Sequence, residues 1–358
     1  MLEALKRRRP DLTAFGMGGG RLVKAGLEPV VRSETLAVVG LFEVFEKLPA
    51  LSRALAAMRK AVRSRTPDAA VLIDFPDFNG ILARGLRRDA VPIVYYVSPQ
   101  VWAWRPGRAR TIAKLARRIV TLFPFEAEIY GRLGADAVCA GHPLVDDVRE
   151  GLEEQPPLPR RKKHRLALLP GSRVAEVRRH WQPMRDAADA LSRRFDLEVV
   201  VVRAPGVPES WFPGAGDRGF SIVSSGRHAA LASSDLAFVA SGTATLEAAL
   251  CGTPMIVVYK MSAVSYAIGK RVVKLPWISL VNIVAGEEVV PELLQEQAHP
   301  ARLEREAAAL LGDPEAAARM RTRLARVSRE LGPPGGSERA ADAILEALEP
   351  PARRRSAR

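Results

Sequence analysis

The sequence predicts an α/β protein built from two Rossmann-like domains, and three observations carry that prediction. Short apolar runs alternate with helical patterns through most of the 358 residues. The runs are apolar throughout, as expected for parallel strands that helices cover on both faces. They also fall into two sets, separated by the proline-rich, basic stretch EEQPPLPRRKKH (153–164), whose composition is typical of a linker.

Each set contains four expected strands. They lie at residues 69–74, 91–97, 118–123 and 135–141 in the first half, and at 165–171, 197–204, 236–241 and 254–259 in the second. A further candidate, LTAFGM (12–17), follows a short amphipathic pattern at 1–9, and the sequence turns helical after residue 300. We therefore expect domains at 1–150 and 166–330, a linker at 151–165, a C-terminal helix at 331–349 and a basic tail at 350–358.

Composition limits the classes of function. The net charge of +14 favours acidic partners, which include nucleic acids, anionic membranes and acidic small molecules. The cations are scattered, without zinc-finger spacing or an RNA-binding aromatic motif, so specific nucleic-acid recognition is not expected. Cys139 and Cys251 form no C-x-x-C pair, which argues against a disulfide framework or a zinc site. No uncharged run reaches the roughly 18 residues of a membrane span.

Two strand–turn–helix transitions in the second half predict anion sites. In LALLPGSRVAEV (166–177), Gly171 allows close approach, Ser172 and the following amides open a helix, and Arg173 adds donors. Unpaired amides and the helix dipole attract anions at such a terminus. Helix capping by Ser172 and an ion pair between Arg173 and Glu176 would explain this turn equally well.

The stretch SGTATLEAAL (241–250) has the same layout. Ser241, Gly242 and Thr243 separate a strand from a short helix, and Glu247 falls within the first turns of that helix. A carboxylate there is also favourable for structural reasons alone. Because ligands bind outside the carboxyl ends of adjacent strands in this architecture, the two turns together predict a nucleotide-diphosphate site.

The first half offers a candidate general base. In VLIDFPDFN (71–79), Asp74 ends an apolar strand, where its carboxylate can accept a proton from a substrate hydroxyl. Asp77 fits an Asx turn or helix cap better than Asp74 does. The stretch LAVVGLFEVFEKLPAL (36–51) is apolar on more than one helical face, so it is either deeply buried or in contact with lipid.

Together these motifs resemble the lipid-A-disaccharide synthases, inverting glycosyltransferases with two Rossmann-like domains and a cleft between them (the GT-B fold). The matching elements occur in the family's order over residues 12–300: LAVVGLFEV, DFPDFN, YVSPQVWAWRPGR, LFPFE, GHPLVD, LLPGSRVAEV, SGTATLEAAL with GTPMIVVY, and LVNIVAGEEVVPELLQE.

The resemblance implies transfer of a sugar from UDP-2,3-diacylglucosamine to 2,3-diacylglucosamine 1-phosphate, with release of UDP. It implies no metal and no redox cofactor, and a peripheral position on the anionic cytoplasmic face of the inner membrane. The C-terminal helix is expected to cross back to the first domain, and members of the family can form dimers.

The resemblance also assigns site residues. Asp74 is expected to be the base, and Gly171, Ser172, Arg173, Ser241, Gly242, Thr243, Glu247 and Asn282 to bind UDP. Expected on the acceptor side are Asp77, Asn79, Ser98, Trp102, Trp104, Arg105 and His142, and expected in contact with lipid are Val39, Leu41, Phe42 and Phe45.

The sequence departs from the family in two places. Val281 stands where the family usually has proline, which predicts a less rigidly held Asn282. The family's opening strand and G-E-x-S-G-D loop are absent, so we expect a longer natural protein or, as the alternative, a degraded and inactive copy. Two other functions stay open, another UDP-hexosamine transferase or epimerase of this fold and a non-catalytic basic protein that binds RNA or membranes.

Overall fold

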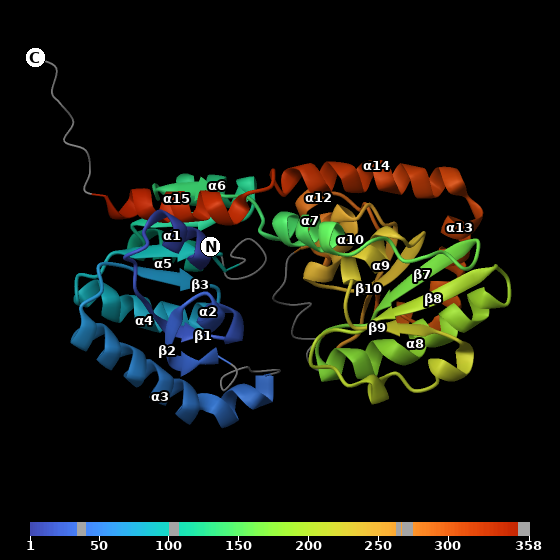
Figure 1. Cartoon of the computed structure of the whole chain (residues 1–358), viewed down its shortest axis with the longest axis horizontal. Coiled ribbons are helices and arrows are strands. Elements are labelled where there is room, and N and C mark those ends of the chain that lie inside the picture. The colour runs from blue at the N-terminus through green and yellow to red at the C-terminus, as the bar shows by residue number, and fades with distance from the viewer. Residues whose placement is uncertain (34–40, 100–106, 263–265, 267–274, 350–358) are drawn as a thin grey trace, which may run out of the picture. The chain divides into compact units, whose positions relative to one another are not determined.

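The chain folds into two compact units in the computed structural model (Figure 1). The structure describes residues 1–33, 41–99, 107–262, 266 and 275–349, without the side chains of 41–47. Unit 1 comprises Met1–Pro143 together with the chain from Pro334, and unit 2 comprises Leu144–Pro333.

Unit 1 contains two parallel sheets. One pairs β1 (Ala14–Gly18) with β2 (Leu27–Arg32), and the other orders β3 (Ala70–Ile73), β4 (Ile93–Tyr96), β5 (Arg118–Thr121) and β6 (Ala137–Cys139) as in the chain. All five strands expected in this half are confirmed. β2 was not expected, because Glu28, Pro29 and Arg32 interrupt its apolar pattern.

Some of the helices of unit 1 form a core with β3, β4 and β5. The helices of this unit are α1 (Leu2–Arg8), α2 (Gly20–Lys24), α3 (Leu41–Arg65), α4 (Pro76–Arg88), α5 (Gly107–Leu115), α6 (Pro124–Gly131) and α15 (Gly336–Leu348). Met58 of α3, Leu86 of α4 and Ile119 of β5 belong to one buried cluster. The last helix, α15, packs on α1 and β5, and Arg8 donates to Asp342 across the contact with α1 at 2.9 Å. The predicted return of the C-terminal helix to the first unit is confirmed.

Unit 2 contains one six-stranded parallel sheet in the order β12-β11-β10-β7-β8-β9. Its strands are β7 (His164–Leu169), β8 (Leu197–Val202), β9 (Ser221–Val223), β10 (Leu236–Ala240), β11 (Met255–Tyr259) and β12 (Glu292–Leu294). The order reverses between β7 and β10, as in a Rossmann fold. All four strands expected here are confirmed, while β9 and β12, with three residues each, are too short for a periodic signal.

Helices cover both faces of this sheet. They are α7 (Leu144–Glu154), α8 (Val174–Ser192), α9 (Arg227–Ala232), α10 (Thr243–Leu250), α12 (Leu280–Ala285), α13 (Pro300–Gly312) and α14 (Pro314–Glu330), with 3-10 turns η2 (Glu209–Trp211), η3 (Gly216–Arg218) and η4 (Gln295–Gln297). Helices α8 and α13 bury one face with Leu166, Leu168, Phe238 and Val258. Helix α10 contacts α7, α9, α12 and α14 as well as β10.

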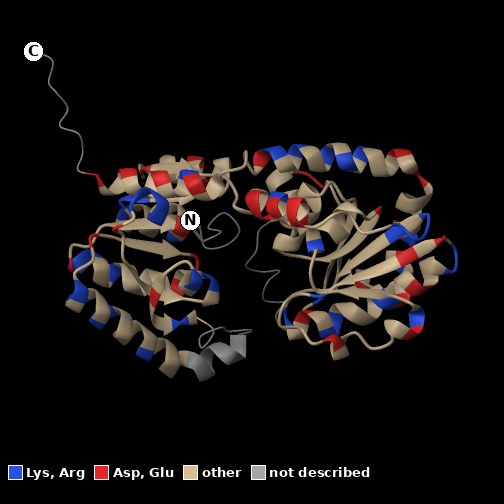
Figure 2. Ribbon diagram, viewed as in Figure 1, with Lys and Arg blue, Asp and Glu red and all other residues tan. Residues whose placement is uncertain are grey.

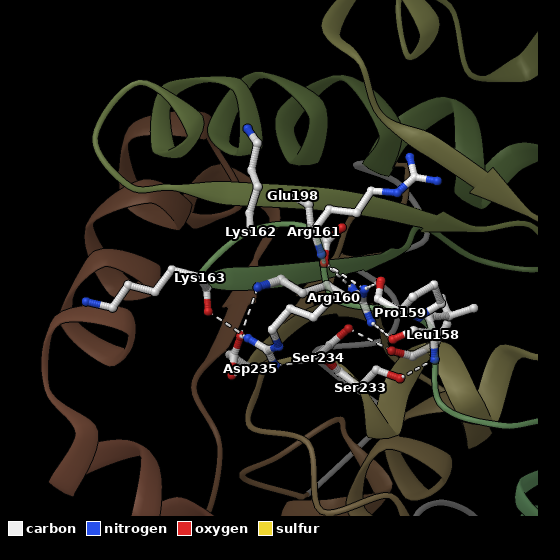
Figure 3. Close-up of polar contacts among 12 residues, drawn as sticks. Leu158, Pro159, Arg160, Arg161, Lys162, Lys163, Glu198, Ser233, Ser234 and Asp235 are labelled. Atoms are coloured by element: carbon white, nitrogen blue, oxygen red, sulfur yellow. Dashed lines mark hydrogen bonds and ion pairs between the residues drawn. The ribbon is translucent and has the colours of Figure 1, made fainter.

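The stretch expected to be a linker lies inside unit 2. Its first residues belong to α7, which packs on α9 and α10, so the units divide at Pro143 instead. Arg160 donates to the Asp235 carboxylate at 2.8 Å, and the fully buried Arg165 donates to Glu198 at 2.8 Å and to the Pro159 carbonyl at 2.6 Å (Figure 3). These contacts anchor the basic stretch to the amino ends of β7 and β10.

Charged side chains are distributed unevenly over the helices. Figure 2 shows Lys and Arg along α3, α4 and α14, with an acidic residue in the first turn of α4 and acidic residues at the ends of α14, and a mainly acidic α7. The described side chains of α3, from Leu48 onward, include no acidic residue. Within the described residues, no helix is long and apolar enough to cross a membrane.

Candidate functional site

The switch point of unit 2 places the two expected phosphate turns side by side. β7 ends at Leu169 and β10 at Ala240, and the two strands pair in parallel with Leu169 opposite Val239. The turns that follow them, 170–173 and 241–242, therefore meet at the carboxyl edge of the sheet. In open α/β sheets this position is where ligands bind.

The turn after β7 leads directly into the first turn of α8. Gly171 has a φ of +130°, and α8 begins at Val174 with Arg173, not Ser172, as the capping residue. The Ser172 N–H donates to Glu176 at 3.3 Å, and Arg173 Nη1 donates to the same carboxylate at 2.6 Å. The expected ion pair is thus present, yet the Arg173 side chain stays 60% exposed and its remaining donors can meet an anion.

The turn after β10 requires glycine. Gly242 has φ 152° and ψ −161°, a region that only glycine adopts without strain. No described atom lies within 4 Å of the position that a Cβ would take there. The Ser241 hydroxyl donates to the Ile278 carbonyl at 2.9 Å, and the Thr245 hydroxyl donates to the Gly242 carbonyl at 2.8 Å. Thr243 opens α10 and is exposed.

Glu247 is buried on α10 and tied to the start of α9. One of its carboxylate oxygens lies 3.1 Å from Arg227 Nε and 3.4 Å from His228 Nε2. Both of these closest approaches are made to the same oxygen, Oε2. A carboxylate acceptor suits a ribose hydroxyl.

Asn282 is fully buried, and the chain itself uses all of its hydrogen-bonding capacity. Its Nδ2 donates to the Val290 carbonyl and to Glu292 at 2.9 and 2.8 Å, while its Oδ1 accepts from the amides of Val289 and Val290 at 2.8 and 3.0 Å. In this structure the Asn282 side chain therefore has no donor or acceptor left over for the expected direct contact with UDP. The four bonds also hold Asn282 firmly despite Val281.

The hydrogen bonds of Asn282 continue through Glu292 to the turn after β10. Glu292 accepts from the amides of Ile278 and Ser279 at 2.8 and 3.0 Å. Since the Ile278 carbonyl accepts from the Ser241 hydroxyl, the network also holds the Ser241 side chain of that turn in place.

In unit 1, Asp74 lies at the carboxyl end of β3 in a strained turn. Asp74 and Phe75 have φ values of +45° and +43°, which cost about 1–3 kcal/mol each. The buried Asn79 holds this turn, because its Nδ2 donates to the carbonyls of Ile73 and Asp74 at 3.1 and 2.6 Å. Asp74 is exposed, and within the described residues its carboxylate forms no hydrogen bond or ion pair.

Asp77 has a different environment. It lies in the first turn of α4, 73% exposed, and pairs with Arg108 of α5. The sequence offered an Asx turn or helix cap as the alternative for Asp77, but the N-cap of α4 is Phe75 and no side chain caps this helix. The geometry therefore favours Asp74 over Asp77 as a proton acceptor.

Two more acceptor-side candidates are buried. Ser98 follows β4 and is buried near Tyr130, and burial raises the pKa of the Tyr130 hydroxyl to about 12. His142 follows β6, with its ring centroid 5.4 Å from that of Phe123.

The remaining expected residues lie outside the described part of the chain. Trp102, Trp104, Arg105 and Val39 belong to segments that the structure does not describe. Leu41, Phe42 and Phe45 belong to the first turns of α3, where side chains are not described.

We expect His142 to make stability depend on pH. Burial lowers its pKa to about 4, below the usual imidazole value of about 6.5. The unfolded chain therefore takes up this proton first as the pH falls, and about 2 kcal/mol of stability is lost between pH 7.5 and pH 5. Denaturant unfolding at both pH values measures the loss, and His142→Gln should reduce it. An unchanged pH dependence in this variant would contradict the assignment.

Several residues that shape the site escaped the sequence reasoning. Arg227, His228 and Glu292 lie in stretches without a glycine-rich turn, and their partners are distant in the sequence. His180 falls on the buried face of α8 with Val177 and Met184, so its position alone indicates core packing.

Comparison with known proteins gives the family. Residues 1–344 match the lipid-A-disaccharide synthetase family. A lipid-A-disaccharide synthase of Syntrophus aciditrophicus is 40% identical over 358 residues, covering 98% of this chain and 94% of the relative. One of Solibacter usitatus is 41% identical, with 98% and 93% covered.

Solved structures with low sequence identity share the fold. A calicheamicin glycosyltransferase matches with a TM-score of 0.64 at 17% identity, covering 97% of this chain and 94% of that one. A putative UDP-N-acetylglucosamine 2-epimerase from Listeria monocytogenes matches with a TM-score of 0.59 at 15% identity, covering 97% and 91%. These likenesses confirm the predicted fold of two Rossmann-like domains. Because residues 1–344 match this family and relatives about 40% identical cover nearly the whole chain, the protein belongs to the lipid-A-disaccharide synthetase family of glycosyltransferases.

Proposed function

We propose that the protein transfers 2,3-diacylglucosamine from its UDP conjugate to 2,3-diacylglucosamine 1-phosphate and releases UDP. The observation that carries the proposal is the pair of turns at the switch point of unit 2. The amides that open α8 and α10 meet the diphosphate together with Arg173, and the Glu247 carboxylate accepts from the ribose.

Asp74 supplies the base in this proposal. As the acceptor hydroxyl oxygen attacks the anomeric carbon of the donor sugar, its proton passes to the Asp74 carboxylate. The bond between that carbon and the diphosphate oxygen breaks, and its electron pair leaves with UDP. The strained turn held by Asn79 supports this role, because strain of this kind is concentrated at functional sites.

We further propose that the protein works at the anionic cytoplasmic face of the inner membrane. Both substrates carry acyl chains, so an enzyme at the surface meets them without extracting them. The first half of α3 supports this position, because Leu48, which lies within the apolar stretch 36–51, is 47% exposed.

The proposal is tested by measuring UDP release. We expect release from UDP-diacylglucosamine only when diacylglucosamine 1-phosphate is present, and little release from UDP-N-acetylglucosamine. Equal use of the donor without acyl chains would contradict the lipid assignment. Conversion of a UDP-hexosamine without any acceptor would indicate an epimerase, and salt-sensitive RNA binding without protection by UDP would indicate a non-catalytic protein.

A further inference from the structure

His180 connects two strand ends beneath the candidate donor site. It is fully buried on α8. Its Nδ1 lies 2.8 Å from the Pro170 carbonyl oxygen, and its Nε2 lies 2.8 Å from the Lys260 backbone nitrogen. The Lys260 N–H can only donate, so Nε2 must accept and Nδ1 must carry the proton that Pro170 accepts. A single neutral tautomer satisfies both bonds.

The two partners of His180 flank the turn after β10. Pro170 directly precedes Gly171 in the turn after β7, and Lys260 directly follows β11. Since β10 lies between β7 and β11 in the sheet, the imidazole joins the strand ends on either side of the 241–242 turn. It therefore fixes the 170–173 turn relative to β11. Strand β11 pairs with β10, the strand that precedes the 241–242 turn.

The segment after β11 is itself fixed from its other side. The Met261 N–H donates to Gln295 Oε1 at 3.3 Å, and Lys260 Nζ donates to the Ala298 carbonyl at 3.3 Å. Lys260 thus offers His180 an anchored backbone donor. Without the imidazole, the Pro170 carbonyl would lose the contact that ties it to this anchor.

We propose that His180 is a positioning residue for donor binding, which holds the 170–173 turn in register with the end of β11. The inference rests on the proposed sugar-nucleotide site of unit 2. His180 acts through the Pro170 carbonyl and the Lys260 amide and does not touch the reacting atoms.

The same geometry makes donor binding sensitive to pH. Protonation places a hydrogen on Nε2, where the Lys260 N–H already points, and breaks that bond. The charged and titratable groups around the ring are Glu176 and Arg179 of α8, and Lys260 and Tyr259 at the end of β11, with the Tyr259 ring centroid 6.0 Å away. Burial lowers the pKa of His180, so the neutral form persists below the usual imidazole range and donor affinity falls only under acidic conditions.

The test compares three variants of the full-length protein. His180→Leu removes both bonds, and His180→Gln restores one donor and one acceptor. Leu191→Ala lowers stability from the opposite end of the same helix without touching either turn. We expect His180→Leu to raise the KM for UDP-diacylglucosamine about tenfold, while kcat stays within about twofold. His180→Gln should bring the KM most of the way back to that of the unchanged protein. Leu191→Ala should have the same KM as the unchanged protein.

Provided that the unchanged protein binds UDP and releases it from the donor, three results would overturn the inference. These are an unaltered KM in His180→Leu, an equal rise in KM in Leu191→Ala, and an imidazole ¹⁵N spectrum that shows His180 protonated at Nε2 at neutral pH. Failure of the unchanged protein to bind UDP would instead overturn the proposed function. The Nδ1-protonated tautomer in that spectrum, with a rise in KM confined to His180→Leu, supports the inference.

Discussion

Replacing Asp74 by asparagine is expected to lower kcat by about 10²–10⁴-fold while the affinity for UDP stays unchanged. The amide has nearly the same shape as the carboxylate, but it cannot accept the proton of the acceptor hydroxyl. Asn79 bonds the Asp74 backbone carbonyl and not its side chain, so the strained turn survives the substitution. Initial rates of UDP release, with UDP affinity measured separately by calorimetry, check both parts of the prediction.

Asp77→Asn is the matched control, because the same chemical change is made three residues away. It weakens the ion pair between Asp77 and Arg108. Because the Asp77 side chain is 73% exposed, this ion pair contributes little to stability. We expect kcat of this variant to remain within a few-fold of that of the unchanged protein. An inactive Asp77→Asn beside an active Asp74→Asn would reverse the assignment of the base.

The strands and the two strand–turn–helix transitions of unit 2 were predictable because their signals are local. Every expected apolar run became a strand, and a strand followed by a glycine turn and a helix can be recognised within about ten residues. The missed strand β2 carries Glu28 and Pro29, which hide its pairing with β1. Its register depends on a partner strand and not on its own alternation of residues.

The errors came from side chains with distant partners. A composition of prolines and cations predicted a free linker, but Arg160 bonds Asp235, 75 residues away, and Arg165 bonds Glu198. The bond between Asn282 and Glu292 was likewise hidden, because the place of Glu292 beside β11 is fixed by sheet order. No periodicity in a single sequence encodes such pairings, so the positioning network of the site became visible only in three dimensions.

Gly242→Ala is expected to weaken UDP binding about 10–100-fold, which corresponds to about 1.4–2.8 kcal/mol. The present backbone, with φ 152° and ψ −161°, is strained for alanine, so the turn shifts and its amides lose their common direction. No described atom approaches the new methyl group within 4 Å, so the space it fills is the space that the proposed phosphate would occupy. Calorimetric titration with UDP measures the effect directly.

Gly252→Ala separates backbone strain from ligand exclusion. Gly252 lies just beyond the other end of α10 with φ +68°, also without a described atom within 4 Å of its Cβ position. Alanine there costs about 1–2 kcal/mol of conformational strain, so both variants should lose similar thermal stability. Only Gly242→Ala should lose affinity for UDP, because only its methyl group lies at the carboxyl edge between β10 and β7. Equal UDP affinity in the two variants would place the diphosphate elsewhere than at this turn.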